Sequence, residues 1–299
     1  MKVPPRTLAK NQRCQVWLHD VERGENRMIF ETSDLLLEAP NWALQGDALI
    51  LNGNGTLWRL ALGAAQLQPI VINGVPPLNN DHVLDPDGAH IFVSSYDDWQ
   101  LYKAPLAGGD AVQISGKEGP AGMLHFLHGV SPDGQQLAFV GVQAEITATS
   151  FRFITAEICT IGADGHGFAQ ITSGGALSDG PEYSPDGQWL YFNTEAFCGH
   201  AQIARMRPDG SEMTRLTDDP TVDWFPHISP DGQLAVHLAY PPGTQGHPAD
   251  LWVDLKLVRG GDWAGATCVA HLFGGQGTIN VNSWSPDSRQ FAYVTYPLG

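Results

Sequence analysis

A four-residue turn that recurs along the chain constrains the fold more than any other feature. Its sequence is Ser-Pro-Asp-Gly or a close variant, and successive copies start about 40 to 56 residues apart. The copies occupy residues 43–47 (degenerate), 85–88, 131–134, 184–187, 229–232 and 285–288. Proline presets φ at the first central position, aspartate bonds to nearby backbone, and glycine tolerates positive φ. Each copy therefore predicts a tight β-hairpin.

Each turn is followed by an alternating or apolar run that is typical of a β-strand. These runs are 48–51, 90–93, 136–140, 189–192, 234–238 and 290–294. Two more strand-like runs then complete a unit, as in 201–207 and 213–216, which are joined by a Pro-Asp-Gly-Ser turn. Four strands in a repeat of roughly 40 to 50 residues are the signature of a β-propeller blade.

Six turns predict six blades of four antiparallel strands, in one all-β domain that covers residues 1–299. Five blades are expected at roughly 35–72, 80–115, 126–172, 180–217 and 224–273. The sixth would combine 280–299 with 14–32, so that N-terminal strands complete the C-terminal blade. Such a closure removes the free sheet edges and ties the ring together.

The charge balance narrows the range of partners and compartments. Asp plus Glu total 32 against 16 Lys plus Arg, a formal charge of −16. Such a surface repels phosphates and anionic lipid, so we expect neither a nucleic acid nor a membrane partner. The four cysteines are far apart and the N-terminus lacks the apolar core of a signal peptide. We therefore expect a cytoplasmic protein with reduced thiols and no organic cofactor.

The connections of a four-stranded blade fall on two faces of the ring, and the two faces differ in sequence. On the turn face the loops are short, and Asp133, Asp186 and Asp231 are turn formers. The opposite face carries irregular polar segments. These segments are 79–82, 125–129, 178–182, 223–227, 240–250 and 273–280. The inner strands start on that face and line the channel, so we expect functional residues there.

The offset of each polar residue from its turn suggests that these side chains converge. His82 and His128 lie three residues before their turns, and Glu182 and His227 lie two before theirs. Asn282 lies three residues before its turn, and Asn41 lies two before its own. A one-residue bulge in some inner strands would reconcile the two offsets. Imidazoles and carboxylates from different blades would then meet in the channel, an arrangement that suits a divalent cation.

The repeats resemble those of the TolB-like six-bladed β-propellers. The resemblance rests on the Ser-Pro-Asp-Gly hairpins, the Leu/Phe-rich strands after them, and the Asp209-Gly210-Ser211 turn ahead of Leu216-Thr217. It covers essentially the whole chain and implies the architecture. It does not imply one function, because such propellers serve as scaffolds, transport factors, peptidase lids and enzymes. A weaker resemblance is to the oligogalacturonate lyases, propellers that hold a divalent metal with histidines and a glutamine. It implies that Gln276 is a metal ligand.

The first hypothesis is an enzyme with a metal at the channel entrance. We expect Mn, Zn, Fe or Ca held by some of His82, His128, His227 and Gln276. The candidates for moving a proton are Asp81, Asp179, Glu182, Asp223 and His247, and the candidates for contacting the ligand are Asn41, Trp224 and Asn282. The reaction would be β-elimination from, or hydrolysis of, a carbohydrate derivative, or the opening of a lactone.

The second hypothesis is a non-catalytic module that binds a peptide, a sugar or another protein on the same face. In that case the histidines only bond to their neighbours, and the tryptophans are wedges between blades. A TolB-like envelope adaptor is a third hypothesis. Metal content separates the first from the other two.

Overall fold

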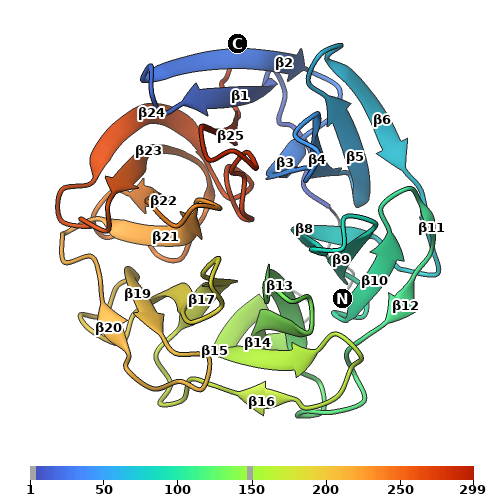
Figure 1. Ribbon diagram of the computed structural model, residues 1–299, viewed down its shortest axis with the longest axis vertical. Helices are drawn as coiled ribbons and strands as arrows, with labels where there is room; N and C mark the ends of the chain where they lie inside the picture. Colours follow the sequence, from blue (N-terminus) through green and yellow to red (C-terminus); the bar gives the residue numbers. More distant parts are fainter. Residues whose placement is uncertain (1–4, 147–150) are drawn as a thin grey trace.

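The computed structural model describes residues 5–146 and 151–299, and this part of the chain consists of β-strands and turns without a helix. Its antiparallel sheets are arranged around a central axis, and the colours in Figure 1 run once around the ring. The predicted all-β, six-bladed propeller is thereby confirmed. None of the described residues forms a helix with the length and hydrophobicity that crossing a membrane requires.

Five blades are four-stranded sheets in which the strands run from the channel outward in chain order. The first two are β3 (Leu37–Trp42), β4 (Ala48–Gly53), β5 (Thr56–Ala61) and β6 (Gln66–Ile70), then β8 (Leu78–Leu84), β9 (His90–Ser95), β10 (Leu101–Pro105) and β12 (Val112–Gln113). A short parallel pair, β7 (Ile72–Asn73) with β11 (Gly109–Asp110), joins these two blades.

The next three blades follow the same order. They are β13 (Leu124–Val130), β14 (Gln136–Ile146), β15 (Phe151–Gly162) and β16 (Ala169–Gln170), then β17 (Ser178–Tyr183), β18 (Leu190–Thr194), β19 (Gln202–Met206) and β20 (Thr214–Arg215), then β21 (Val222–Ile228), β22 (Leu234–Tyr240), β23 (Ala249–Arg259) and β24 (Thr267–Gly275).

The sixth blade closes the ring with strands from both ends of the chain, as predicted. β25 (Gln290–Thr295) pairs with β1 (Cys14–Asp20), which pairs with β2 (Glu25–Thr32). The innermost position is taken by an irregular segment, 278–284, which joins the sheet through the bridge between Trp284 and Phe291. This segment reaches the centre of the ring in Figure 1, and Ile279 and Val281 on it are fully buried.

The repeated turns hold the inner hairpins with one set of hydrogen bonds. In the third blade the Ser131 N–H donates to the Gln136 carbonyl, and the Asp133 carboxylate accepts from the Ser131 hydroxyl and the Gln135 N–H. The copies at 184–187, 229–232 and 285–288 repeat these contacts. These aspartates are therefore turn formers. Apolar side chains of the second strands, such as Phe92, Phe139 and Phe192, are buried in the sheets' packed faces.

Candidate functional site at the polar mouth of the channel

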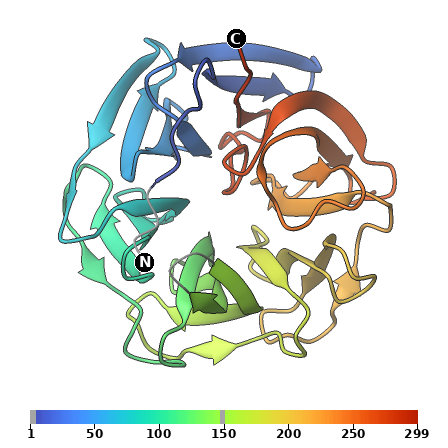
Figure 2. The same ribbon diagram turned by 180° about the vertical axis from the view of Figure 1, so that it is seen from behind.

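The channel has two mouths of different chemistry. At the first, which we call the polar mouth, a cavity of about 80 Å³ is bordered by polar and aromatic side chains and one valine. These are Asn79, Asn80, Asp81, Tyr96, Phe126, His128, Val142, Phe153, Asp179, Phe225, His247, Gln276 and Asn280. The N-terminal segment runs across this face (Figure 2), where the Arg6 guanidinium donates to the Gln276 carbonyl and to Glu38.

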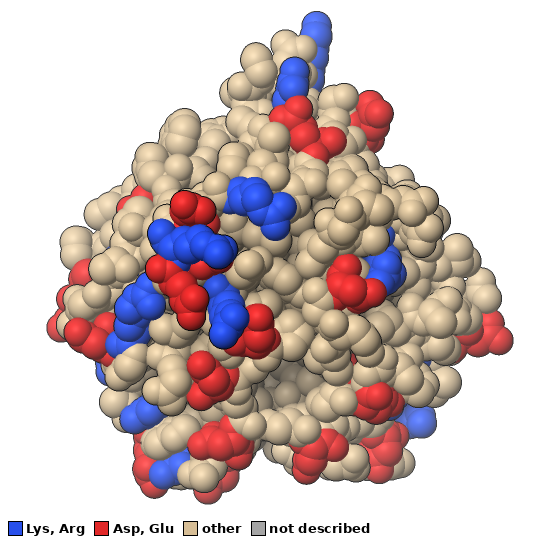
Figure 3. Space-filling model, turned by 45° about the horizontal axis from the view of Figure 1, so that its top comes forward, with Lys and Arg blue, Asp and Glu red and all other residues tan. Residues whose placement is uncertain are grey.

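At the second mouth, which we call the proline mouth, a cavity of about 390 Å³ opens on the turn face. The prolines of five repeated turns line it, namely Pro86, Pro132, Pro185, Pro230 and Pro286. Figure 3 shows this face tilted forward, with a hollow below its centre and acidic side chains around it. His128 borders both cavities and so separates the two mouths.

Bulges in the inner strands aim side chains into the channel. In β13 the residue without a cross-strand partner is His128, between Leu127 and Gly129. In β3, β17 and β21 the bulge contains two residues without a cross-strand partner, and the second of them is a proline, namely Pro40, Pro181 or Pro226. A bulge re-aims a side chain and bends its strand. Here it lets His128 extend from the third blade to Asp179 on the fourth and to the Asn280 carbonyl on the sixth.

Two imidazoles face one carboxylate at the polar mouth. His128 Nε2 lies 3.2 Å from Asp179 Oδ1, and His247 Nε2 lies 3.8 Å from Asp179 Oδ2. Each Nδ1 faces another oxygen, the Asn280 carbonyl for His128 and the Gln276 side-chain oxygen for His247. If each Nδ1 carries the proton, both Nε2 lone pairs point at the carboxylate. A proton or a metal cation is then needed between them.

The charges of this group depend on one another. Burial alone would lower the pKa of His128, but Asp81 and Asp179 outweigh it and raise this pKa to about 9. Burial raises the pKa of Asp81 to about 6, with His128 opposing the rise and Asp179 adding to it. Burial also lowers the pKa of His247. Without a metal, His128 therefore carries the proton and Asp81 titrates close to neutrality.

A strained residue supports the aromatic side of the site. Phe225 has φ of 56°, a left-handed conformation that costs a non-glycine residue about 1–2 kcal/mol. Its ring stacks on His128 at 5.8 Å between centroids and meets His247 edge-on at 5.2 Å. Its N–H donates to Asn193, which holds this backbone. Strain of this kind persists where the surroundings enforce it, often at functional sites.

Four of the predicted site residues form a hydrogen-bonded belt across the channel, between the two mouths. Glu182 accepts from His227 Nδ1 at 2.6 Å, from the Ile228 N–H at 2.9 Å and from Asn282 Nδ2 at 2.7 Å. Asn41 Nδ2 donates to the Asn282 carbonyl at 2.6 Å. His227 Nε2 also contacts the Ile279 carbonyl. Both His227 nitrogens thus face oxygen atoms, and Asn41, Glu182 and Asn282 border the proline mouth.

The remaining predicted residues divide between the polar mouth and the surrounding core. His82 is fully buried, with Nδ1 3.1 Å from the Asn80 carbonyl and Nε2 3.2 Å from the Ile50 carbonyl. Asp223 is buried beside Thr221 and borders neither cavity. Trp224 packs on the His247 ring at 4.4 Å.

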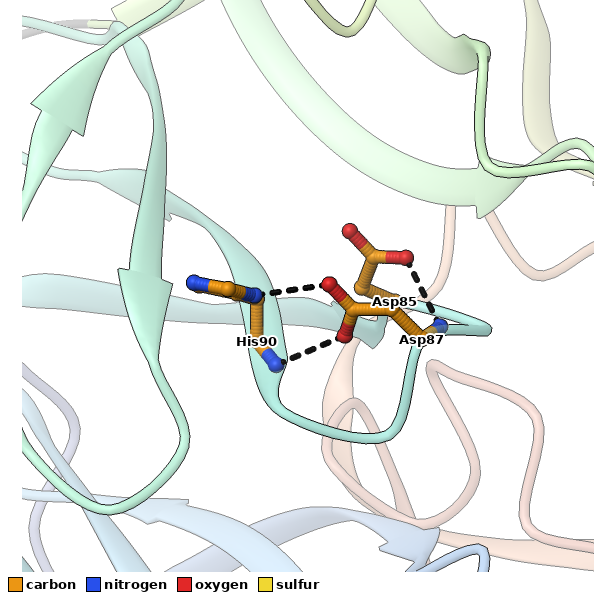
Figure 4. Close-up of side chains that lie close together, drawn as sticks. All are labelled: Asp85, Asp87 and His90. Atoms are coloured by element: carbon orange, nitrogen blue, oxygen red, sulfur yellow. Dashed lines mark hydrogen bonds and ion pairs between the residues drawn. The ribbon is translucent and has the colours of Figure 1, made fainter.

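A tighter group of potential metal ligands lies away from the channel. Asp85, Asp87 and His90 belong to the turn of the second blade, and their ligand atoms lie within 4.8 Å of one another (Figure 4). It is the only such group of three His, Cys, Asp or Glu residues among the residues described. Lys103 Nζ already lies 2.6 Å from Asp85 Oδ2, and Asp87 accepts from His90. These contacts already occupy one carboxylate oxygen of Asp85 and both of Asp87.

Several residues of the polar mouth did not emerge as candidates from the sequence. Asn80 is 3% exposed, and its amide nitrogen has no hydrogen-bond partner among the described residues. Asn280 bonds to Asp81 and supplies the carbonyl that faces His128. Both lie in irregular polar segments, and this was the only feature of the sequence that could have marked them as site residues. No such feature marks Phe153, which borders the cavity from β15 in the long hairpin of β14 and β15, 11 and 12 residues in length.

Comparisons with known proteins identify close relatives of the whole chain. The uncharacterized protein Atu1656 of Agrobacterium fabrum is 36% identical over 290 residues, which are 96% of this chain and 93% of that protein. A solved structure described as "putative TolB" from Agrobacterium tumefaciens is 35% identical, with a TM-score of 0.85 over 96% of this chain and 99% of that one. No family model matches the chain.

A manganese complex of oligogalacturonate lyase shares the fold alone. It is 13% identical, with a TM-score of 0.57 over 95% of this chain and 76% of that one. The predicted resemblance to this class is thus a likeness of architecture. The relatives that match nearly end to end are more informative, and with the six repeats and the closed ring they establish that the chain belongs to the TolB-like six-bladed β-propellers.

Proposed function

We propose that the polar mouth binds a divalent cation and, with it, a small oxygen-rich ligand, as in a metal-dependent lyase or hydrolase. The observation that carries the proposal is the convergence of two imidazole Nε2 atoms on Asp179, with each Nδ1 already committed to an oxygen. In metal sites a ligating histidine commonly donates its other N–H to a carbonyl or carboxylate. The Asn280 carbonyl and Gln276 would fill that role.

The donor set favours particular ions. Two imidazoles and one carboxylate suit Mn, Fe or Zn, whereas Ca and Mg prefer oxygen ligands. His128, Asp179 and His247 would hold the ion, and Gln276 would orient His247 rather than bind the ion itself. The donor atoms of His128, Asp179 and His247 are spread wider than those of Asp85, Asp87 and His90, so the two imidazoles would move toward the ion as it binds.

The surrounding residues suit chemistry on a carbohydrate derivative or a lactone. A divalent cation held there would polarise a carbonyl or a hydroxyl of the ligand. Asp81, with its pKa raised to about 6 by burial, is mostly ionised at pH 7 and can accept a proton. A cavity of about 80 Å³ admits one functional group, and the rings of Tyr96, Phe126 and Phe153 offer an apolar surface to the rest of the ligand.

Metal analysis of variants tests the proposal. The protein is purified without chelator or immobilised nickel, and bound Mn, Fe and Zn are measured. Wild type is expected to hold close to one ion per chain, and His247→Ala and Asp179→Asn to lose most of it. His90→Ala, in the Asp85 group, is the control and should keep the metal. Metal lost from His90→Ala alone, or absent throughout, contradicts the proposal.

The small size of the polar cavity favours a second candidate, a module that binds the end of a larger sugar, peptide or protein without chemistry. The same metal-loaded protein separates the two functions. Lactones or oligosaccharides that are converted, with conversion lost in Asp81→Asn, support the enzyme. Ligands that bind and are recovered unchanged support the binding module.

A further inference from the structure

The proline mouth takes no part in the function proposed above, although its cavity is the larger of the two. The volume of about 390 Å³ lies within the range of pockets that bind ligands, about 300–1,000 Å³. Apolar side chains of several blades form most of its walls, namely Trp42, Val83, Leu84, Val130, Ile228 and Trp284. The five prolines around it are exposed, and Leu44 beside them is 45% exposed. The turn face therefore presents an apolar hollow to solvent.

One buried donor beside this cavity lacks an acceptor. Trp42 borders the cavity and is 6% exposed, and its indole N–H has no hydrogen-bond partner among the described residues. The indole N–H of Trp284, the other tryptophan of the cavity, donates to the His227 carbonyl. A buried donor without an acceptor is destabilising. An acceptor from a bound molecule, such as a peptide carbonyl, would satisfy Trp42.

Three exposed carboxylates, which we call the acidic arc, follow the prolines of consecutive turns on one side of the mouth. They are Asp133, Asp186 and Asp231, of the third, fourth and fifth blades. Oδ1 of each accepts the bonds of its own turn, and these bonds, above all that from the turn's serine, lower its pKa. Among the described residues, no lysine or arginine forms an ion pair with the arc, since Arg207 near Asp186 pairs with Glu212. The arc is therefore ionised at neutral pH, with Oδ2 available to a cation.

We propose that the proline mouth binds a segment of another protein in which apolar side chains are flanked by lysine or arginine. The apolar side chains enter the hollow between the prolines, and the cations pair with the acidic arc. A backbone carbonyl of the segment accepts from Trp42. The formal charge of −16 disfavours a second copy of this chain at the mouth, because like charges would meet.

The test uses a synthetic peptide with two leucines between two Lys-Lys pairs, which carries an uncharged coumarin and is followed by fluorescence anisotropy. We expect saturable binding with a Kd below about 1 mM. A peptide with glutamate in place of lysine, and another with serine in place of leucine, should each bind at least about ten times more weakly. Added NaCl should weaken the binding of the basic peptide, because the carboxylates of the arc are exposed and salt screens them.

Variants of the rim locate the binding surface. Asp133→Asn and Asp231→Asn keep an oxygen that can accept the bonds of the turn and remove only the charge, so each should weaken binding about two- to fivefold. Leu44→Ser, at the edge of the hollow, should weaken it as well. Asp209→Asn is the matched control, because Asp209 accepts similar bonds in the turn between the outer strands β19 and β20. It removes the same charge and should leave the affinity unchanged.

Four results would overturn the proposal. The first two are a basic peptide that does not bind and an acidic peptide that binds equally well. The third is an Asp209→Asn variant that loses as much affinity as the two arc variants, since the attraction would then have no defined site. The fourth is a dimer in sedimentation velocity that Leu44→Ser dissociates, which would show that a second copy covers the mouth. His247→Ala, at the polar mouth, should bind the peptide as wild type does, so this test and the metal analysis can fail separately.

Discussion

Replacing Glu182 with alanine tests whether the belt across the channel holds the blades together. The carboxylate of Glu182, on the fourth blade, accepts three hydrogen bonds, from His227 and the Ile228 N–H of the fifth blade and from Asn282 of the sixth. Alanine would leave all three donors buried without this acceptor. Each unsatisfied buried donor costs about 1–3 kcal/mol, so three of them together cost at least about 3 kcal/mol.

The expected loss for Glu182→Ala is therefore at least about 3 kcal/mol in the free energy of unfolding. For a chain of this size each kcal/mol lowers Tm by about 2 °C, so Tm should fall by at least about 6 °C. Glu182→Gln is the informative comparison. Its amide oxygen can still accept from Ile228 and Asn282, and its NH₂ can donate to His227 Nδ1 while Nε2–H donates to the Ile279 carbonyl. We expect its cost to stay below about 2 kcal/mol.

Thermal unfolding followed by circular dichroism measures both variants, with the exposed Glu25→Ala as a control that should stay within about 0.5 kcal/mol of wild type. A Tm of Glu182→Ala within 2 °C of wild type would show that the belt does not hold the blades together. Equal losses for the alanine and glutamine variants would show instead that charge, rather than hydrogen bonding, stabilises the belt.

Two further predictions concern buried groups outside the site. Burial lowers the pKa of His82 from 6.5 to about 4. Above pH 6.5 its imidazole is neutral in both states, and between pH 6.5 and 4 only the unfolded chain gains the proton, so stability should fall by up to about 3 kcal/mol. Urea unfolding of His82→Gln should show a shallower pH slope, and equal slopes would contradict this. A Cβ on Gly129 would lie 2.7 Å from the Pro181 carbonyl, so Gly129→Ala should cost about 1–3 kcal/mol in the same assay. A Cβ on Gly63 would meet no described atom within 4 Å, so Gly63→Ala should be neutral.

The architecture could be predicted because its signals are local. A Ser-Pro-Asp-Gly turn specifies its hairpin through bonds within six residues, such as those of Ser131 and Asp133 to the backbone at 135 and 136. Six such turns, with unclaimed strands at the N-terminus, determine both the blade number and the closure by β1. The irregular inner segment of the sixth blade was harder to predict, because 278–284 is shaped by contacts with other blades.

The site depends on distances across the ring, which a sequence does not contain. His128 and His227 both precede a repeated turn, yet the bulge of β13 directs His128 toward Asp179, whereas His227 pairs with Glu182 in the belt. An offset of one residue thus separates a candidate ligand from a structural one. His247 lies in a long loop, and only the folded chain shows that it faces Asp179.

Anomalous diffraction from crystals soaked in a manganese salt would show whether the polar mouth binds a metal ion. We expect one dominant anomalous peak at the polar mouth, within about 2.0–2.3 Å of His128 Nε2, His247 Nε2 and an Asp179 oxygen. The same crystals of His247→Ala should lose that peak. A peak confined to Asp85, Asp87 and His90, or a polar mouth without one at saturating metal, would contradict the account.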